Sequence, residues 1–493
     1  MADPGRKKNL LRVGLLVLWA LLFGLLLKRD YFIKTLETRE AQVVRKGREE
    51  SFSGVYFRDR RIGYVKNRLV PQAGNTFRLG QEAYLRLNIL EQVHPVRLKV
   101  NALLEGDLRL RDFDFELTSP FYTMRAKGRV AGTRVDFTLT TGKEEIQDSI
   151  QLDRPPYLST NRRGYLLTQN LRKGDKLKLP YFDPLSLTGK DTVVEYLGYE
   201  KELINGRIFQ LHRFSETFSG VKISFWLDDE GKVIKEESPA GFVFLAEPEF
   251  RATDLAVAGE EILSSVSVAV KGKMVADYAS RGELRVRLTL PEGGGFALEG
   301  DRQEMSGNEL VVRRESLPAE TATACAGPKE ALASTPYIQA GNQRIGEQVT
   351  AILGETRGDL ARVRKLAAWV YANLEKRPVL GIPDALTTLE TRRGDCNEHA
   401  ALFAALARKA GIPTRIAAGV TYHAGAFYYH AWNEVCLDGR WLSLDTTKNQ
   451  LPADVTHIRF VNGETDEQIR IGALLGRLGI EVVDDADVPA RKR

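Results

Sequence analysis

The feature that most constrains this chain is a period-two alternation of apolar and polar side chains over residues 51–254. Residues 134–140 and 207–214 are runs of this kind. Turn residues separate the runs at a spacing of roughly eight to twelve positions, which is typical of short strands. Successive side chains of a strand point to opposite faces, and short connections join antiparallel neighbours. We therefore expect an antiparallel meander that forms a curled sheet.

Changes in composition divide the rest of the chain. Strand-like segments continue to residue 317, so we assign 51–317 to antiparallel β-rich structure, as one region or with a second small β unit. Residues 318–335 begin with PAETATACAGP, which is small, polar and bounded by proline, and we expect a linker there. Helical periodicity follows, so we expect a mixed α and β domain over 336–463 and a last helix with a charged tail over 464–493. The predicted fold class is α+β.

The N-terminus carries one apolar run, residues 10–27, which only Arg12 interrupts and which basic residues flank on both sides. A membrane-spanning helix needs about 20 apolar residues, so this run is slightly short. We expect a short tail and an uncleaved transmembrane anchor over residues 1–29, and a polar juxtamembrane stalk over residues 30–50. A removed signal peptide and a buried core helix are the alternatives. The charge pattern alone does not fix the orientation.

Composition excludes one class of partner and limits the disulfides. The 493 residues carry a formal net charge of +6 with no long basic run, so we expect no nucleic-acid partner. The three cysteines, Cys325, Cys396 and Cys436, are too few for a disulfide framework and leave at least one thiol unpaired. We expect Cys325 to be an incidental exposed thiol and Cys436 to be buried in a strand.

The sequence predicts a helix start at Asp395, next to a cysteine. Asp395 and Glu398 have the spacing of a capping box, and Gly411 supplies a stop, so the sequence predicts a helix over residues 396–410. Cys396 would be the first residue of that helix. The unpaired N–H groups and the positive end of the helix dipole favour an anion there, so we expect a lowered thiol pKa.

A hairpin follows that helix. The Asp-Gly dipeptide at 438–439 is a strong two-residue turn signal between strands predicted at 428–437 and 440–445. In the register that this turn sets, Asp445 is a diagonal neighbour of His430 on the same face, close enough to accept a hydrogen bond from the imidazole. The chain thus offers a nucleophile, a base and a group that orients the base.

The words G-D-C-N-E-H-A, H-A-W-N-E-V and W-L-S-L-D-T-T, with their order and spacing, resemble the bacterial transglutaminase-like family, relatives of papain-type cysteine enzymes. The resemblance covers about residues 337–462. It implies a papain-like α+β domain with Cys396 as nucleophile, His430 as general base and acid, and Asp445 as the residue that orients His430.

The segment FSGVYFRDRRIGYV also resembles the β-rich N-terminal regions that accompany such domains in membrane-anchored bacterial proteins. The resemblance implies a single-pass protein of the inner (cytoplasmic) membrane, with its large domain on the extracytoplasmic, periplasmic side. It does not imply what the β-rich region binds.

Three further residues are expected to line the cleft, namely Trp432, Asp395 and His399. Trp432 shares the face of His430 in the predicted register, and His399 lies one helical turn after Cys396. The backbone N–H of Cys396 is a natural donor for an oxyanion hole. The papain-like pattern would supply a glutamine as second donor where this chain has Glu390, so the second donor stays unassigned.

A zinc site is the alternative for His399. Cys396 and His399 form a C-x-x-H pair that could supply two ligands, with His423 and His430 completing a tetrahedron. The spacing from the other thiols does not suit a zinc site, and Asp445 would have no role in one. We therefore expect no metal and no cofactor.

The expected function is acyl transfer from peptide or glutamine-type amides through a thioester on Cys396. Water as the second reactant gives a protease or a deamidase, and an amine gives a transglutaminase. The partner is then a protein or peptide substrate. The alternative is a catalytically silent domain that binds peptides or serves as a structural module of the cell envelope.

Overall fold

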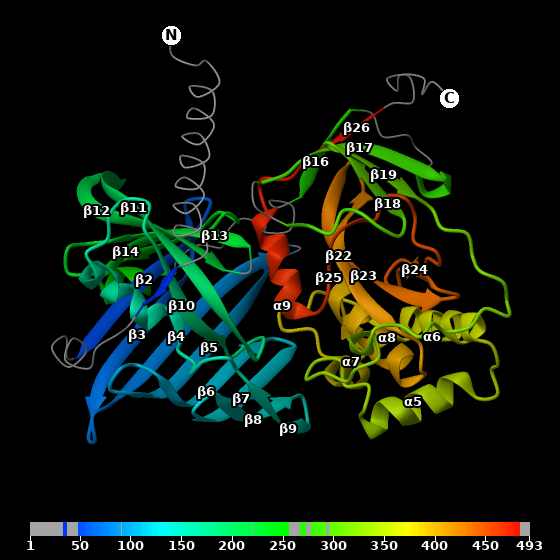
Figure 1. Ribbon diagram of the computed structural model, residues 1–493, viewed down its shortest axis with the longest axis horizontal. Helices are drawn as coiled ribbons and strands as arrows, with labels where there is room; N and C mark the ends of the chain where they lie inside the picture. The colour runs from blue at the N-terminus through cyan, green and yellow to red at the C-terminus, as the bar shows by residue number, and fades with distance from the viewer. Residues whose placement is uncertain are drawn as a thin grey trace, which may run out of the picture.

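The computed structural model describes residues 33–36, 48–89, 91–218, 220–255, 267–272, 278–291 and 295–483. Two large sheets lie side by side (Figure 1). The first, coloured blue to green, is on the left, and the second, with the yellow helices, is on the right.

The first sheet has 15 strands in the order β1-β10-β11-β12-β13-β14-β15-β2-β3-β4-β5-β6-β7-β8-β9. Every pairing from β2 to β15 is antiparallel, as the alternation predicts, and β1 runs parallel to β10. The strands are β1 Lys34–Thr35, β2 Glu49–Phe57, β3 Arg60–Gln72, β4 Thr76–Ile89, β5 Gln92–Glu105, β6 Leu110–Ser119, β7 Tyr122–Ala131, β8 Arg134–Thr141, β9 Glu144–Gln151, β10 Lys176–Asp183, β11 Thr188–Ile204, β12 Arg207–Phe218, β13 Val221–Leu227, β14 Val233–Glu237 and β15 Phe242–Ala246.

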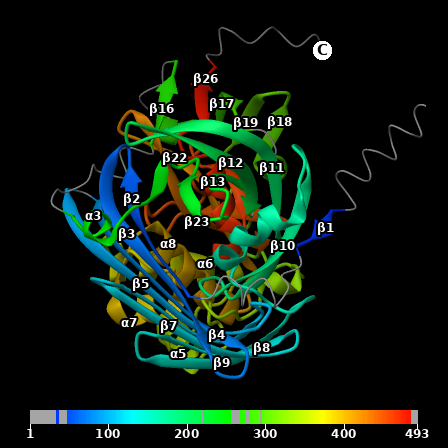
Figure 2. The ribbon, with the colours of Figure 1, turned by 90° about the vertical axis from the view of Figure 1, so that its left-hand side faces the viewer.

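This sheet is curled, as Figure 2 shows. Strands β6 and β10 are far apart in the strand order, yet Phe113 on β6 and Phe182 on β10 have ring centroids 5.3 Å apart. The 3-10 helix η1, Ser159–Gln169, adds the buried side chains of Tyr165 and Leu166 to the core. Because side chains from distant strands meet, the concave face of the sheet is a packed core.

The second sheet has nine strands, in the order β18-β19-β17-β26-β16-β23-β22-β25 with β24 paired to β23. Helix α8 packs on β23, and α5, α6 and α7 surround α8 in one apolar core. The elements are β16 Val268–Lys271, β17 Glu283–Thr289, β18 Gln303–Ser306, β19 Glu309–Arg313, α5 Gln343–Leu353, α6 Asp359–Asn373, α7 Ala385–Thr391, α8 Cys396–Lys409, β22 Thr414–His423, β23 Ala426–Leu437, β24 Arg440–Leu444, β25 Ile458–Asn462 and β26 Gly479–Val482. A separate two-stranded sheet joins β20 Glu375–Lys376 to β21 Arg393–Gly394. Short helices also occur at α3 Glu249–Ala252, η2 Tyr278–Ser280, η3 Lys329–Ala331, α9 Thr465–Gln468 and η4 Ile469–Ala473.

The second sheet takes strands from three separate parts of the chain. Val268 on β16 pairs with Phe427 on β23, and Val270 pairs with Ile480 on β26. The strands of residues 268–313, which the sequence pattern grouped with the preceding β-rich region, are thus hydrogen-bonded to the sheet of the C-terminal part. The hairpin of β23 and β24 therefore belongs to a sheet that also includes strands from residues 268–313 and from β26.

The proline-bounded segment of residues 318–335 packs along the β23–β24 hairpin. Ala324 forms a β-bridge with Leu437, and the N–H of Thr323 donates to Asp438 Oδ1 over 2.9 Å. Cys325 is joined to Cys436 by a disulfide. The prediction of an incidental exposed thiol at Cys325 is therefore wrong, because pairing of this segment with the hairpin brings the two sulfurs together.

The α+β fold class is also wrong, because the described part of the chain is mostly β-strand. The sequence pattern overestimated helix at the C-terminal end, where a single long helix was expected. That segment contains only α9 and the 3-10 helix η4 before the chain turns at Gly476, whose φ is +67°. Gly472 and Gly476 account for this, since glycine is a poor helix former.

The expectation of a single-pass membrane protein is corrected as well. Among the described residues, no helix is long and apolar enough to cross a lipid bilayer. The apolar run at 10–27, on which the anchor and the inner-membrane location depended, lies outside the described residues, as does most of the expected stalk at 30–50.

The first sheet packs against the segment that leads into α8. The ring of Tyr122, at the start of β7, lies so close to Gly381 that a Cβ there would be 2.4 Å from it. Lys143 Nζ in the β8–β9 turn pairs with Glu390 over 2.9 Å, and Arg344 of α5 pairs with Glu144 over 2.8 Å. The first sheet thus helps to fix the approach to the helix that begins at Cys396.

Candidate active site

Helix α8 begins at Cys396, as the capping box predicts. Asp395 Oδ1 accepts from the N–H of Asn397 over 2.9 Å, and Glu398 Oε2 accepts from the N–H of Asp395 over 2.9 Å. The reciprocal bonds satisfy donors that a helix start otherwise leaves unpaired. They hold Cys396, the free cysteine of the chain, in a partly exposed position at the first turn.

The β23–β24 hairpin positions the other two residues of the predicted triad. Asn433 pairs with Leu444 and Glu434 with Ser443, which is the predicted register. Asp445 follows the last residue of β24, and its Oδ2 accepts a hydrogen bond from His430 Nε2 over 2.8 Å. Because Nε2 donates to Asp445, Nδ1 is the ring nitrogen of His430 that can take up a proton.

The thiol of Cys396 lies beside this pair. The backbone N–H of Ala431, the residue after His430, is close enough to lower the thiol pKa, and Asp445 is close enough to raise it. Burial of the sulfur has the largest effect and, with the charge of Asp395, leaves the pKa of Cys396 well above its ordinary value. The prediction of a lowered pKa is therefore wrong, because desolvation and neighbouring carboxylates outweigh the helix N-terminus.

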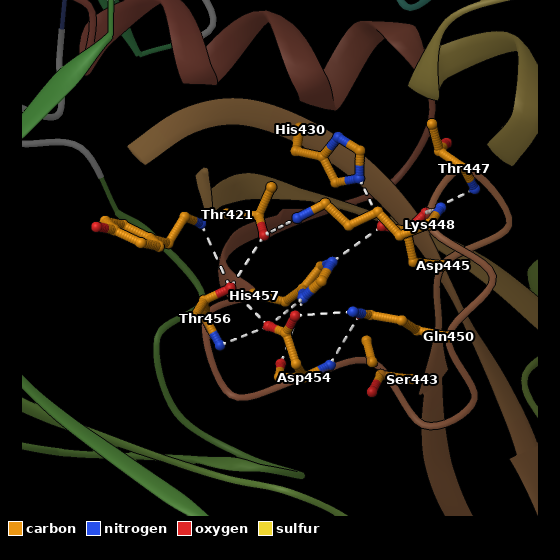
Figure 3. Close-up of polar contacts among 12 residues, drawn as sticks. Thr421, His430, Ser443, Asp445, Thr447, Lys448, Gln450, Asp454, Thr456 and His457 are labelled. Atoms are coloured by element: carbon orange, nitrogen blue, oxygen red, sulfur yellow. Dashed lines mark hydrogen bonds and ion pairs between the residues drawn. The ribbon is translucent and has the colours of Figure 1, made fainter. Parts of the chain in front are cut away.

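Asp445 is fully buried and accepts hydrogen bonds on both oxygens (Figure 3). Oδ1 accepts from the N–H groups of Thr447 and Lys448 over 2.7 and 3.1 Å, and Oδ2 accepts from His430 and His457. Burial alone would raise the pKa of Asp445, but the charges and hydrogen bonds of His430 and His457 hold it well below its usual range. Asp445 is thus a fixed anion facing His430.

His457 is a member of the site that the sequence pattern did not single out. Its Nε2 lies 3.0 Å from Asp445 Oδ2 and its Nδ1 lies 3.1 Å from Asp454 Oδ1. Burial alone would lower the pKa of His457, but the hydrogen bonds to Asp445 and Asp454 raise it. The one sequence signal is the i, i+3 spacing of Asp454 and His457, which is too common to identify a site.

The sequence pattern did not single out Lys448 as a member of the site either. Its Nζ donates to Thr421 Oγ1 over 2.8 Å, and Figure 3 shows its side chain extending past Asp445 toward Thr421. Burial lowers the pKa of Lys448, against the opposing effects of nearby Asp454, Asp445 and Cys396. An ammonium group therefore lies within electrostatic range of the thiol.

The three residues that were expected to line the cleft differ in their burial and in their contacts. Trp432 is almost completely buried and stacks on His430, with ring centroids 6.3 Å apart. Asp395 caps α8. His399 is fully buried, its Nδ1 donates to the carbonyl of Asp395 over 2.7 Å, and burial lowers its pKa. Glu390, at the position of the papain-like glutamine, forms ion pairs with Lys143 and Arg344.

One cluster brings together atoms of the kind that bind metals. Within the part of the chain that the structure describes, His430, Asp445 and His457 each offer a ligand atom within 4.8 Å of the others. The same atoms are already matched as hydrogen-bond donors and acceptor, so we assign this cluster as a hydrogen-bond network. The zinc alternative, which combined Cys396 and His399 with His423 and His430, does not correspond to this grouping.

A capped helix with a cysteine at its first position packs on a hairpin with a histidine–aspartate pair, which is an arrangement that cysteine enzymes use. Residues 347–446 match the sequence profile described as the transglutaminase-like superfamily. The C-terminal part of this chain therefore contains a transglutaminase-like domain.

Two curated relatives are similar over part of the chain. Kyphoscoliosis peptidase of Mus musculus is 30% identical over 148 residues, which are 27% of this chain and 22% of the relative. Kyphoscoliosis peptidase of Homo sapiens is 31% identical over 120 residues, or 21% of this chain and 18% of the relative. The matches thus span only about a fifth of the length of these relatives.

A solved structure from Cytophaga hutchinsonii, designated a candidate cysteine protease, shares 16% identity. The similarity covers 43% of this chain and 92% of that one, with a TM-score of 0.27. The comparisons support a transglutaminase-like domain over part of the chain.

Proposed function

We propose that this chain is a cysteine enzyme that transfers acyl groups from peptide or glutamine-type amides through a thioester on Cys396. The observation that supports it most is the 2.8 Å hydrogen bond from His430 to the buried carboxylate of Asp445, beside the thiol at the start of α8. Such a pair orients a general base and stabilises it once it is protonated.

The raised thiol pKa indicates how the proposed reaction begins. With the thiol neutral at rest, His430 Nδ1 takes the proton of Cys396 as the sulfur attacks the amide carbonyl carbon. The carbon–nitrogen bond then breaks, the same proton passes from Nδ1 to the leaving amine, and an acyl thioester remains. Asp445 stabilises the imidazolium that exists between these two transfers.

The second half of the reaction restores the enzyme. Water or an amine attacks the thioester carbon and its proton passes to His430 Nδ1. The carbon–sulfur bond then breaks, and the same proton passes from Nδ1 to the sulfur, which restores the thiol and the neutral imidazole. Water gives hydrolysis or deamidation, and an amine gives a cross-link. We favour hydrolysis, because both curated relatives carry the name peptidase.

The experiment that tests this proposal is incubation of the full chain with a peptide library, followed by mass spectrometry of the peptides. Shorter peptides indicate proteolysis, the deamidation mass shift indicates hydrolysis of side-chain amides, and incorporation of an added amine indicates transamidation. Cys396→Ala should give none of these products. Identical products from the wild type and Cys396→Ala would contradict the proposal.

A second candidate function is peptide binding without catalysis, and the raised pKa of Cys396 is the observation that favours it. A buried neutral thiol with no working base would behave in this way. The same incubation distinguishes the two functions, because a binding module leaves every peptide unchanged while it retains some of them during gel filtration.

A further inference from the structure

The inference concerns His457, which shares the carboxylate of Asp445 with His430. The Nε2 atoms of His430 and His457 lie 2.8 and 3.0 Å from the same oxygen, Asp445 Oδ2. The two imidazole rings are 5.7 Å apart and cross edge to face. Figure 3 shows His430 above and His457 below the oxygen of Asp445 that they share, with the other ring nitrogen of His457 toward Asp454. His457 is completely buried, so it has no contact with substrate.

The second ring nitrogen of His457 also faces a carboxylate. Nδ1 lies 3.1 Å from Asp454 Oδ1, which also accepts from the N–H and the hydroxyl of Thr456 over 2.9 and 2.5 Å. The other oxygen, Oδ2, accepts from Gln450 Nε2 over 2.9 Å. Against the effect of burial, the hydrogen bonds from His457, Thr456 and Gln450 hold the pKa of Asp454 well below its usual range, so its carboxylate is ionised and only accepts.

Asp445 is an acceptor for the same reason. Its Oδ1 accepts from two backbone N–H groups and its Oδ2 accepts from His430, and the pKa of Asp445 lies well below its usual range, so the carboxylate is ionised and has no proton to donate. Because both partners of His457 can only accept, both of its ring nitrogens must donate. An imidazole that donates from both nitrogens carries a positive charge.

We infer that His457 is a buried imidazolium and a positioning residue of the proposed acyl-transfer site. It holds the Asp445 carboxylate in place and balances part of the negative charge that faces His430. The inference rests on the proposed function for the role of His430. The charged or titratable groups around His457 are the acceptors Asp445 and Asp454, the neighbouring ring of His430, the ammonium of Lys448, and Arg302, which donates to the carbonyl of Asp454 over 2.7 Å.

Removal of the His457 charge has a defined electrostatic consequence. Without this charge, His457 no longer balances part of the negative charge of Asp445, so the thiolate of the nearby Cys396 is less stable. A charge within about 4 to 6 Å of a titratable group shifts its pKa by about one to three pH units. Loss of the charge therefore moves the pH dependence of the thiol to higher pH, whereas a role in packing alone would change its reactivity equally at every pH.

The first experiment measures the rate of Cys396 alkylation by iodoacetamide against pH in the full chain, with the disulfide intact. In His457→Gln we expect the midpoint to rise by about one pH unit relative to the wild type. The matched control is His212→Gln, because His212 also pairs with an aspartate, Asp229 at 3.2 Å, but lies in the first sheet. Its profile should coincide with that of the wild type. An unshifted midpoint in a folded His457→Gln protein would overturn the inference.

The second experiment needs no variant at position 457. In the wild type labelled with nitrogen-15 histidine, NMR should show both ring nitrogens of His457 protonated from about pH 5 to about pH 8, while an ordinary histidine loses a proton near pH 6.5. Replacement of the other histidines one at a time assigns the signal. A single protonated ring nitrogen at neutral pH would overturn the inference even if His457→Gln did not fold.

The two experiments also separate this inference from the proposed function. If His430→Ala leaves the alkylation rate of Cys396 unchanged at every pH, the proposed acyl-transfer function fails. The nitrogen NMR signals still report the protonation of His457 directly, so they test its charge independently of the proposed function.

Discussion

Cys325 and Cys436, which are 111 residues apart in the sequence, form a disulfide with a Cα–Cα distance of 5.4 Å. The bond joins the proline-bounded segment to β23, the strand that carries His430. All three cysteines of the chain lie in the described part, so this pairing leaves Cys396 as the free thiol.

We predict that iodoacetamide modifies the unreduced chain at one position, Cys396. Intact-mass measurement should show a single adduct, and peptide mapping should place it on the first turn of α8. After unfolding in reductant, adducts should appear on Cys325 and Cys436 as well. Modification of Cys436 without reductant would show that the disulfide does not form.

Loss of the disulfide should destabilise the chain. Replacement of both Cys325 and Cys436 by serine removes a cross-link that closes a long loop, which typically lowers the free energy of unfolding by about 2 to 4 kcal/mol. Urea unfolding followed by tryptophan fluorescence measures the difference. The Cys396→Ser variant is the control, since it removes a cysteine without removing a cross-link. Equal unfolding midpoints for the double variant and the wild type would contradict the prediction.

Asp445→Asn should lower kcat by about 100- to 10,000-fold with little change in KM, the range expected when general acid–base catalysis is lost. The asparagine keeps the shape but replaces one acceptor by a donor, so it cannot satisfy both the imidazoles and the backbone N–H groups. Steady-state kinetics on a peptide found by library screening provides the measurement. Asp229→Asn, at the exposed partner of His212, is the matched control and should retain wild-type kinetics.

The buried hydrogen-bond network of Asp445, Asp454 and His457 should also make the stability of the fold fall at both low and high pH. The pKa values of Asp445 and Asp454 are lowered by folding, so their contribution is present above about pH 4 and is lost as the pH falls through the folded values. The pKa of His457 is raised, so its contribution is complete below about pH 6.5 and is lost as the pH rises through the folded value.

Midpoints of urea unfolding measured at a series of pH values test both the acid loss and the alkaline loss of stability. The wild type should lose stability toward both ends of the range. His457→Gln should be less stable at neutral pH and should lack the alkaline loss that the imidazolium causes. Parallel curves for the two proteins on the alkaline side would show that His457 does not titrate as described.

The contact of Tyr122 with Gly381 should couple the first sheet to the approach of α8. A methyl group in Gly381→Ala would press into the buried Tyr122 ring, and such overpacking costs about 1 to 3 kcal/mol. In a background that already carries Tyr122→Ala, the same change should cost much less, because the obstructing ring is gone. Urea unfolding of the four proteins measures this double-mutant cycle, and additive effects would show that the contact does not exist.

Local patterns predicted the parts of the site that depend on neighbouring residues. The capping box of Asp395 and Glu398 fixes the start of α8, and the Asp-Gly turn fixes the hairpin register, so the hydrogen bond from His430 to Asp445 could be predicted. The alternation over residues 51–254 likewise predicted antiparallel pairing. Each of these relationships involves short-range geometry with few alternatives.

The features that the sequence did not predict depend on distant packing. The Cys325–Cys436 disulfide requires the segment after residue 317 to lie along the hairpin, and no local pattern encodes that approach. His457 reaches Asp445 because the chain after β24 turns back at the β-bridge between Asp445 and Gln450 before it enters β25. The thiol pKa was predicted in the wrong direction because the helix start is visible in the sequence, whereas the burial of the sulfur is not.

Trapping of an acyl group on Cys396 is a direct test of the proposed thioester chemistry. The full chain is mixed briefly with reactive peptides, quenched in acid, and digested for mass spectrometry. The account predicts an acyl adduct on the α8 peptide that hydroxylamine removes, that His430→Ala reduces and that Cys396→Ala abolishes. The absence of an adduct on Cys396 in a protein that nevertheless cleaves, deamidates or cross-links the peptides would contradict the account.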